Sequence, residues 1–153
     1  MRIVSVLENH IIEKRIAITP DIAKKYIALG LDVSLPENYG EHLGFKDNDY
    51  KELGVEISKD EKEIINSADI IVQLGLLSDD NLLLLKENQT LIGVLNPHIN
   101  KEKIEKLSKK NINIFSLEML PRITRAQSMD ILSSQANLAG YKAVIESFAN
   151  FEK

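Results

Sequence analysis

The chain has 153 residues, of which 44% are hydrophobic and 27% are charged, and these proportions are typical of one globular domain rather than a disordered chain. Its net charge is −4 and it has no cysteine, so we expect no nucleic-acid binding, no disulfide and no zinc–thiolate site. The apolar runs are too short to cross a bilayer and the amino-terminal residues lack a targeting signal, so any membrane association is expected to come through a partner.

Short strands and short amphipathic helices alternate along the first 116 residues. The clearest helix has Thr19 as its N-cap and Pro20 at its first position, and Gly30 ends it. Strands are predicted at residues 2–7, 31–35, 55–57, 68–74, 90–95 and 112–116, and further helices at 47–53, 59–66, 79–86 and 101–109. This alternation predicts an α/β three-layer sandwich with a mostly parallel sheet, of the flavodoxin-like or Rossmann-like type.

From about Ala126 the chain is predicted to form one long helix, so we expect an α/β domain at residues 1–125 and an interdomain-type helix at 126–153. If this helix begins near Thr124, hydrogen-bonding side chains recur on one face at steps of three and four. These residues are Gln127, Asp130, Ser134, Asn137 and Tyr141.

Two interpretations of this polar stripe stay open. Thr124 and Gln127 fit a capping box, and Asp130 suits the first turns of a helix, so the residues could serve the helix alone. Alternatively, the preceding Arg122 and the carboxamide, carboxylate and hydroxyl groups of the stripe suit a planar ligand that carries an amide.

The stretch PRITRAQSMDILSSQANLAGY, from Pro121 to Tyr141, resembles the signature loop and interdomain helix of the NAD(H)-binding alpha subunit of proton-translocating NAD(P) transhydrogenases. In that family an arginine, a glutamine, an aspartate and a serine surround the nicotinamide ring. The resemblance places these roles on Arg122, Gln127, Asp130 and Ser133, with Ser134 as a further cofactor-binding candidate.

The resemblance also implies an activity and partners. The activity is hydride transfer between NADH and NADP, coupled to proton translocation. NADP(H) is expected on a partner subunit in the membrane. The chain would then be cytoplasmic and peripheral to the inner membrane through its partner subunits.

No two glycines form the G-x-G of a dinucleotide-binding fingerprint, whose glycines admit the pyrophosphate to a helix N-terminus. In the transhydrogenase family a second, Rossmann-type domain after the long helix binds this part of NAD. We therefore expect the remaining NAD-binding domain to lie outside this chain, and the chain alone to lack hydride-transfer activity. A non-catalytic truncated remnant is the alternative.

Alanine dehydrogenases share the expected fold and offer a further alternative, half of an amino-acid-linked oxidoreductase. Arg15 matches an arginine that they use for the substrate carboxylate, although transhydrogenases also have it. The lysine and histidine that they require correspond here to Gln73 and Asn96, which cannot act as cation or proton donor at neutral pH. Amino-acid oxidation is therefore disfavoured, and these three residues remain candidates for a pocket.

The remaining residues favour no other chemistry. His10, His42 and His98 lie in three predicted loops without a metal-binding spacing, so we expect no metal site. Small residues such as Ala136 and Gly140, together with apolar ones on the long helix, predict close helix contacts and a homodimer.

Overall fold

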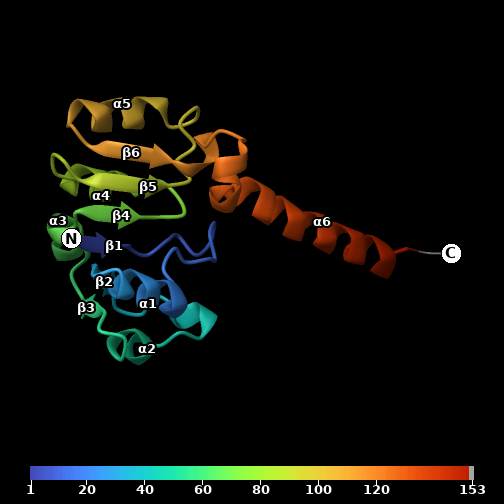
Figure 1. The fold of residues 1–153 in the computed structure, drawn as a ribbon, viewed down its shortest axis with the longest axis horizontal. Helices are drawn as coiled ribbons and strands as arrows, with labels where there is room; N and C mark the ends of the chain where they lie inside the picture. The colour runs from blue at the N-terminus through green and yellow to red at the C-terminus, as the bar shows by residue number, and fades with distance from the viewer. Residues whose placement is uncertain (152–153) are drawn as a thin grey trace. The chain divides into compact units, whose positions relative to one another are not determined.

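The structure is a computed structural model that describes residues 1–151 (Figure 1). The chain divides into two units, Met1–Ser116 and Leu117–Lys153. The first unit contains the sheet and five α-helices, and the second contains two short 3₁₀ helices and the long helix α6.

Six parallel strands form the centre of the first unit. Their order is β3-β2-β1-β4-β5-β6, so β1 and β4 lie side by side in the middle. The strands are β1 (Arg2–Val4), β2 (Asp32–Pro36), β3 (Glu56–Ser58), β4 (Ile70–Val72), β5 (Thr90–Gly93) and β6 (Asn113–Ser116). The predicted parallel sheet is confirmed.

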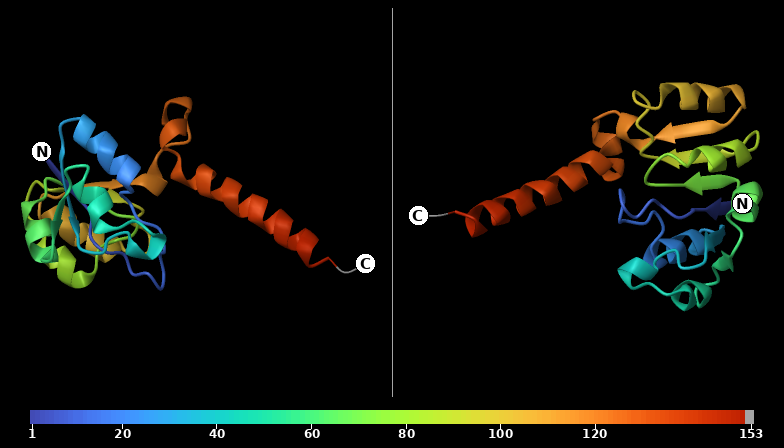
Figure 2. Two further views of the ribbon diagram at one scale, coloured as in Figure 1. Left: turned by 90° about the horizontal axis from the view of Figure 1, so that it is seen from below. Right: turned by 180° about the vertical axis from the view of Figure 1, so that it is seen from behind.

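Helices cover both faces of this sheet. They are α1 (Pro20–Ala28), α2 (Asp47–Lys51), α3 (Glu61–Ser67), α4 (Asp79–Leu84) and α5 (Lys101–Lys109), with a 3₁₀ helix η1 at Glu41–Leu43. One hydrophobic cluster contains Ile3 and side chains of α1 and α2, and the other contains Val4 and side chains of α3, α4 and α5. Neighbouring residues of a strand point to opposite faces, so the clusters lie on opposite faces and the predicted three-layer arrangement is confirmed (Figure 2).

The boundaries of α1 follow its local sequence. The Thr19 hydroxyl accepts a hydrogen bond from the Ile22 N–H, and Pro20 occupies the first turn, where its missing N–H costs nothing. Gly30 follows the helix with a φ of +80°, a left-handed conformation that glycine adopts without strain. The predicted N-cap and stop are both confirmed.

The central strands are shorter than predicted, because side chains replace the backbone ladder at their carboxyl ends. β1 ends at Val4 instead of Leu7, and the Val6 N–H donates to the side-chain oxygen of Gln73 at 3.0 Å. The same glutamine lies just beyond the end of β4, which stops at Val72. The Gln73 N–H makes a last ladder bond to the Ile92 carbonyl, and the next N–H, that of Leu74, bonds to the Glu8 carboxylate at 2.6 Å. Side-chain acceptors thus replace the ladder where the local sequence would continue both strands.

The second unit begins with η2 (Leu117–Met119) and η3 (Thr124–Met129), which precede α6 (Ile131–Ala149). The predicted helix start at about Ala126 is wrong, because Asp130 has an extended backbone and is the N-cap of α6. The predicted capping box is also absent, since η3 has Ile123 as its N-cap and no side-chain cap bond. The helix also ends earlier than predicted, because α6 stops at Ala149 and Asn150 is its C-cap. The last two residues of the predicted helix, 152 and 153, lie outside the described residues.

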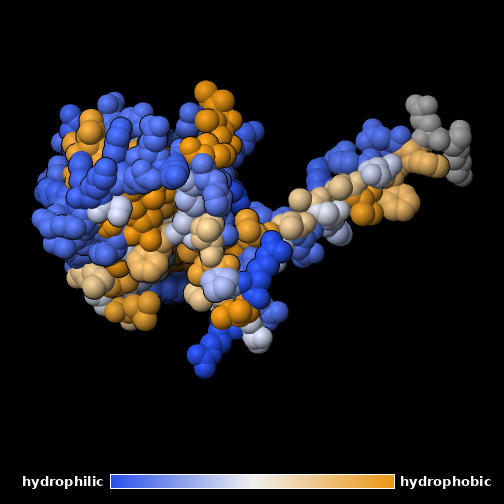
Figure 3. All heavy atoms as spheres, turned by 90° about the horizontal axis from the view of Figure 1, so that it is seen from above, coloured by the Kyte–Doolittle hydropathy of each residue, from blue (hydrophilic) through white to orange (hydrophobic). Residues whose placement is uncertain are grey.

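The polar stripe therefore does not form one continuous helix face, since Gln127 lies in η3 and the later members lie in α6. All side chains of α6 are at least partly exposed, including Leu138, Tyr141 and Phe148. Figure 3 shows apolar and polar atoms along this helix. Among residues 1–151, no helix combines the length and apolar character that a bilayer crossing requires.

Candidate cofactor-contacting site

An open groove of about 400 Å³ lies within the second unit, between the two 3₁₀ helices and the first turn of α6. Arg122, Gln127, Asp130 and Ser133 all line it. Its other lining residues are Leu117, Glu118, Leu120, Pro121, Ile123, Thr124, Ala126 and Leu132. The structure thus brings together the four residues that the resemblance singled out, around a space open to solvent.

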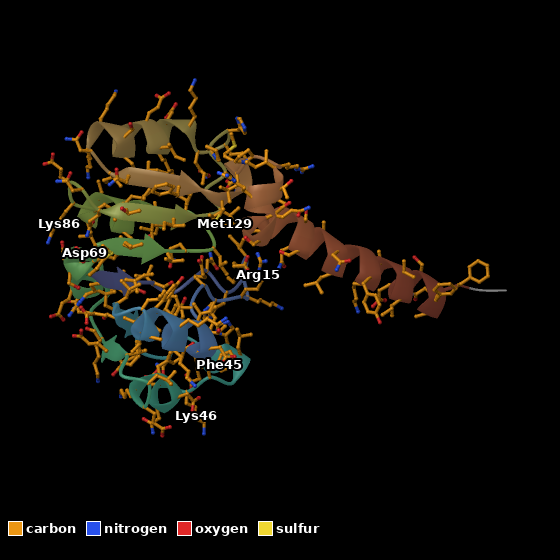
Figure 4. The ribbon with its side chains drawn as sticks, viewed as in Figure 1. Arg15, Phe45, Lys46, Asp69, Lys86 and Met129 are labelled. Atoms are coloured by element: carbon orange, nitrogen blue, oxygen red, sulfur yellow. The ribbon has the colours of Figure 1, made fainter. Side chains whose placement is uncertain are left out.

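Backbone turns shape the groove. The Leu120 N–H bonds to the Leu117 carbonyl at 3.2 Å, and the Ala126 N–H bonds to the Ile123 carbonyl at 2.9 Å. Ala126 is the buried residue of η3, whereas Met129 at the end of η3 is exposed (Figure 4). With these turns, polar side chains from η2, η3 and the start of α6 line one space.

Asp130 connects the groove to α6. Its Oδ1 accepts hydrogen bonds from the backbone N–H groups of Leu132 at 3.0 Å and Ser133 at 2.9 Å, and its Oδ2 accepts one from the Ser133 hydroxyl at 2.6 Å. The pKa of Asp130 is lowered, first by the Ser133 hydroxyl and then by these backbone groups, with a last contribution from Arg122. The carboxylate therefore stays ionised beside the groove at neutral pH.

Ser134 lies outside the groove. Its hydroxyl donates to the Ile131 carbonyl at 3.1 Å within the first turn of α6. The structure does not group Ser134 with the other candidates, because it is absent from the groove lining and its hydroxyl bonds within the helix. Glu118 and Thr124 line the groove although the sequence does not mark either as a ligand contact. No local pattern indicates Glu118, because its position depends on the turn of η2.

Acidification tests the capping role of Asp130. Because its folded pKa is lowered, the carboxylate stabilises α6 above the usual aspartate pKa of about 3.9, and this contribution is lost as the pH falls through the folded value. We expect the amide NMR signals of Leu132 and Ser133 to report fraying of the first turn below about pH 4.

Asp130→Asn keeps a capping oxygen but cannot titrate, so this acid transition should disappear in that variant. Glu146→Gln removes a carboxylate at the far end of α6 and serves as the control, with the transition unchanged. A transition of the same midpoint in Asp130→Asn contradicts the assignment.

The three further candidates lie in the first unit, and they do not share one cavity. The Arg15 guanidinium pairs with the Glu13 carboxylate through Nε–Oε1 at 2.9 Å and Nη2–Oε2 at 2.7 Å (Figure 4). Gln73 is buried and lines a cavity whose walls include neither Arg15 nor Asn96. Asn96 has a φ of 48° in the turn after β5, where its carbonyl accepts from the N–H groups of Ile99 and Asn100.

Two of the three histidines are neighbours, which their sequence spacing did not indicate. The rings of His10 and His42 have centroids 3.9 Å apart, and His42 Nε2 lies 2.8 Å from the Lys14 carbonyl oxygen. In the described part of the chain, no group of three or more histidine, aspartate or glutamate side chains could hold a metal ion.

A parallel sheet of this strand order with helices on both faces defines a Rossmann-like α/β domain, here without the glycine fingerprint of a pyrophosphate site. The chain belongs to the family described as alanine dehydrogenase/PNT, N-terminal domain, whose model matches residues 6–139.

Relatives support this assignment. The chain is 42% identical over 157 residues to the first part of the NAD(P) transhydrogenase subunit alpha of Rickettsia prowazekii, covering 100% of this chain and 41% of that protein. The crystal structure of transhydrogenase from Sinorhizobium meliloti superposes with a TM-score of 0.87 at 33% identity, covering 99% of this chain and 45% of that one.

Alanine dehydrogenase 1 of Staphylococcus aureus is 26% identical over 133 residues, covering 87% of this chain and 34% of that protein. The chain therefore spans less than half the length of each of these relatives, and its similarity to the transhydrogenases is the greater.

Proposed function

We propose that this chain supplies the nicotinamide-contacting loop of the NAD(H)-binding alpha subunit of a proton-translocating NAD(P) transhydrogenase. The observation that carries the proposal is the groove on which Arg122, Gln127, Asp130 and Ser133 converge. The 42% identity to a transhydrogenase alpha subunit supports it. NAD(H) is the cofactor of this groove, and NADP(H) belongs to a partner subunit.

The donor set fits a nicotinamide carboxamide. Gln127 offers both a carbonyl oxygen and two N–H donors, which match the two halves of a ligand amide. The Ser133 hydroxyl donates to Asp130, so its lone pairs remain acceptors for a ligand N–H. This pairing fixes the orientation of an amide without proton transfer to it.

Electrostatics add a redox preference. The ionised Asp130 favours the positive charge of the oxidised ring, and Arg122 moderates this effect. The bound cofactor supplies the hydride, while the side chains of the loop position the ring and exclude other orientations. The loop thereby contributes geometry and charge to the reaction.

In this proposal a further NAD-binding domain binds the NAD pyrophosphate, because this chain lacks the glycine fingerprint of a pyrophosphate site. In this proposal residues 1–125 are the α/β domain and residues 126–153 include the helix that connects to that domain. The chain alone is inactive, and it associates with the membrane only through the NADP-binding partner. The exposed apolar side chains of α6 support association as a homodimer.

Complementation tests the proposal. The chain should be fused to the region of the Rickettsia prowazekii relative that it does not cover, and NADH binding measured by fluorescence for the fusion and for the chain alone. We expect saturable binding by the fusion, weak or no binding by the chain alone, and hydride transfer to NADP only when the NADP-binding partner is added.

A folded fusion that does not bind NADH contradicts the proposal and favours the non-catalytic alternative. Oxidation of alanine with NAD by the fusion would instead support the alanine-dehydrogenase alternative, which Gln73 and Asn96 disfavour because neither supplies a cation.

A further inference from the structure

A cavity of about 750 Å³ lies in the first unit, at the carboxyl ends of β1 and β4. The strand order reverses between these two strands, since the chain continues to β2 on one side of β1 and to β5 on the other side of β4. Parallel α/β sheets commonly bind their ligands at such a switch point. None of the described residues that line the groove also lines this cavity.

Gln73 presents an unused donor to this cavity. The residue is only 3% exposed, and its Oε1 accepts hydrogen bonds from the Val6 N–H at 3.0 Å and the Ser5 hydroxyl at 2.5 Å. A backbone N–H can only donate, so these contacts fix which end of the carboxamide is the oxygen. Among the residues that the structure describes, none accepts a hydrogen bond from the Nε2 of Gln73, which is left for the cavity.

A relay of hydroxyls fixes this orientation further. The Tyr39 hydroxyl accepts from the N–H groups of Ala17 at 3.1 Å and Ile18 at 3.2 Å, and it donates to the Ser5 oxygen at 2.8 Å. Ser5 in turn donates to Gln73. Because every proton along this series has an assigned acceptor, the Gln73 side chain cannot flip without breaking several buried bonds.

Carboxylates outnumber cationic groups in the wall of the cavity. Four carboxylates, from Glu8, Glu13, Glu61 and Asp79, line it together with one ammonium group, that of Lys103. Two of the four are neutralised within the chain, since Glu13 pairs with Arg15 at 2.7 Å and Asp79 pairs with Lys103 at 2.6 Å.

The other two accept hydrogen bonds only from neutral donors in the described part of the chain. Glu8 Oε1 accepts from the Leu74 N–H at 2.6 Å and the Gly75 N–H at 3.3 Å, which leaves its Oε2 unengaged. Glu61 accepts two long bonds, from the Leu7 N–H at 3.3 Å and the Asn81 side chain at 3.5 Å. Burial raises the pKa of Glu8, and the two backbone N–H groups offset only part of this effect.

We propose that this cavity binds a small primary ammonium compound that also carries a neutral hydrogen-bond acceptor. Its ammonium group would contact Glu8 and Glu61, and its acceptor would take the free N–H of Gln73. A ligand carboxylate is disfavoured, because Lys103 in the cavity wall already pairs with Asp79, and Arg15 already pairs with Glu13. The proposal is independent of cofactor binding in the groove.

Titration of the isotope-labelled full chain with 2-aminoethanol tests this inference. We expect saturable shifts of the Gln73 side-chain amide signals in NMR spectra. Ethanol, which lacks the ammonium group, and 3-aminopropanoate, which has a carboxylate in place of the hydroxyl, should each bind at least about tenfold more weakly, a difference of about 1.4 kcal/mol. No saturable shift, or equal shifts with ethanol, overturns the proposal and leaves Gln73 solvated by water alone.

A variant gives a second readout without disturbing the core. Glu61→Gln keeps a side-chain acceptor for the Leu7 N–H but removes the charge, and we expect it to weaken 2-aminoethanol binding by at least about fivefold. The control is Glu105→Gln on α5, which removes an equal charge outside the cavity and should leave the affinity unchanged. Equal affinity of Glu61→Gln and the unmodified chain contradicts the assigned ammonium contact.

Discussion

Gly93→Ala is expected to destabilise the first unit by about 3 kcal/mol, the upper part of the range for overpacking in a close-packed interior. Gly93 is the last residue of β5, and a Cβ atom there would lie 2.4 Å from the Gln73 carbonyl oxygen and 3.2 Å from a Leu95 methyl carbon. The clashing oxygen belongs to the backbone, so it cannot move aside as a flexible side chain would. The same residue is also held to β5, because the Gln73 N–H bonds to the Ile92 carbonyl at 2.9 Å. Relief therefore requires β4 and β5 to separate.

Urea unfolding followed by circular dichroism measures this effect as a lower midpoint. Gly75→Ala is the matched control, since a Cβ atom at Gly75 meets only Glu8 Oε2, at an ordinary 3.5 Å. We expect the control to change the free energy of unfolding by less than about 0.5 kcal/mol. A Gly93→Ala midpoint equal to that of Gly75→Ala would show that the two strands can separate at little cost.

Gln127→Ala, made in the completed subunit, is expected to lower the turnover of hydride transfer roughly ten- to hundredfold while leaving NADH affinity nearly unchanged. Gln127 lines the groove from η3, and in the proposed function its carboxamide orients the nicotinamide rather than supplying most of the binding energy. Loss of orientation lowers the fraction of bound cofactor whose ring is aligned for transfer, which reduces turnover more than affinity.

Single-turnover kinetics and NADH titration separate the two quantities. Asn137→Ala is the control, because Asn137 is exposed on α6 and outside the groove, and it should leave turnover unchanged. Unchanged turnover in Gln127→Ala rejects the orienting role. A large loss of NADH affinity with unchanged turnover of the bound complex would assign Gln127 to binding alone.

The fold could be predicted from the sequence because its signals are local. Alternating strands and helices predict the parallel three-layer domain, and the Thr19 and Gly30 signals correctly delimit α1. The start of α6 could not be predicted in this way, because two capping signals compete within a short stretch, Thr124 with Gln127 and Asp130 with Ser133. The second prevails, and its aspartate caps two backbone N–H groups and also accepts the Ser133 hydroxyl.

The two candidate sites could be predicted less completely than the fold, because they depend more on contacts between residues far apart in the sequence. The resemblance identified four residues of the groove, but the turn that adds Glu118 leaves no pattern in the sequence. The orientation of Gln73 depends on Ser5, which is 68 residues away, and Ser5 depends on Tyr39. A sequence could show that Gln73 replaces a lysine, but it could not show that the carboxamide oxygen is fixed and its nitrogen free.

The shared use of Asp130 couples two events that would otherwise be independent. One carboxylate both closes the first turn of α6 and borders the space assigned to the nicotinamide. A ligand that competes with the backbone N–H groups for the Asp130 carboxylate must weaken the first turn of α6. A ligand that leaves these hydrogen bonds in place must favour the helical conformation. The two equilibria are thermodynamically linked. If binding of a ligand changes the equilibrium constant for forming the first turn of α6 by some factor, formation of that turn changes the affinity for the ligand by the same factor.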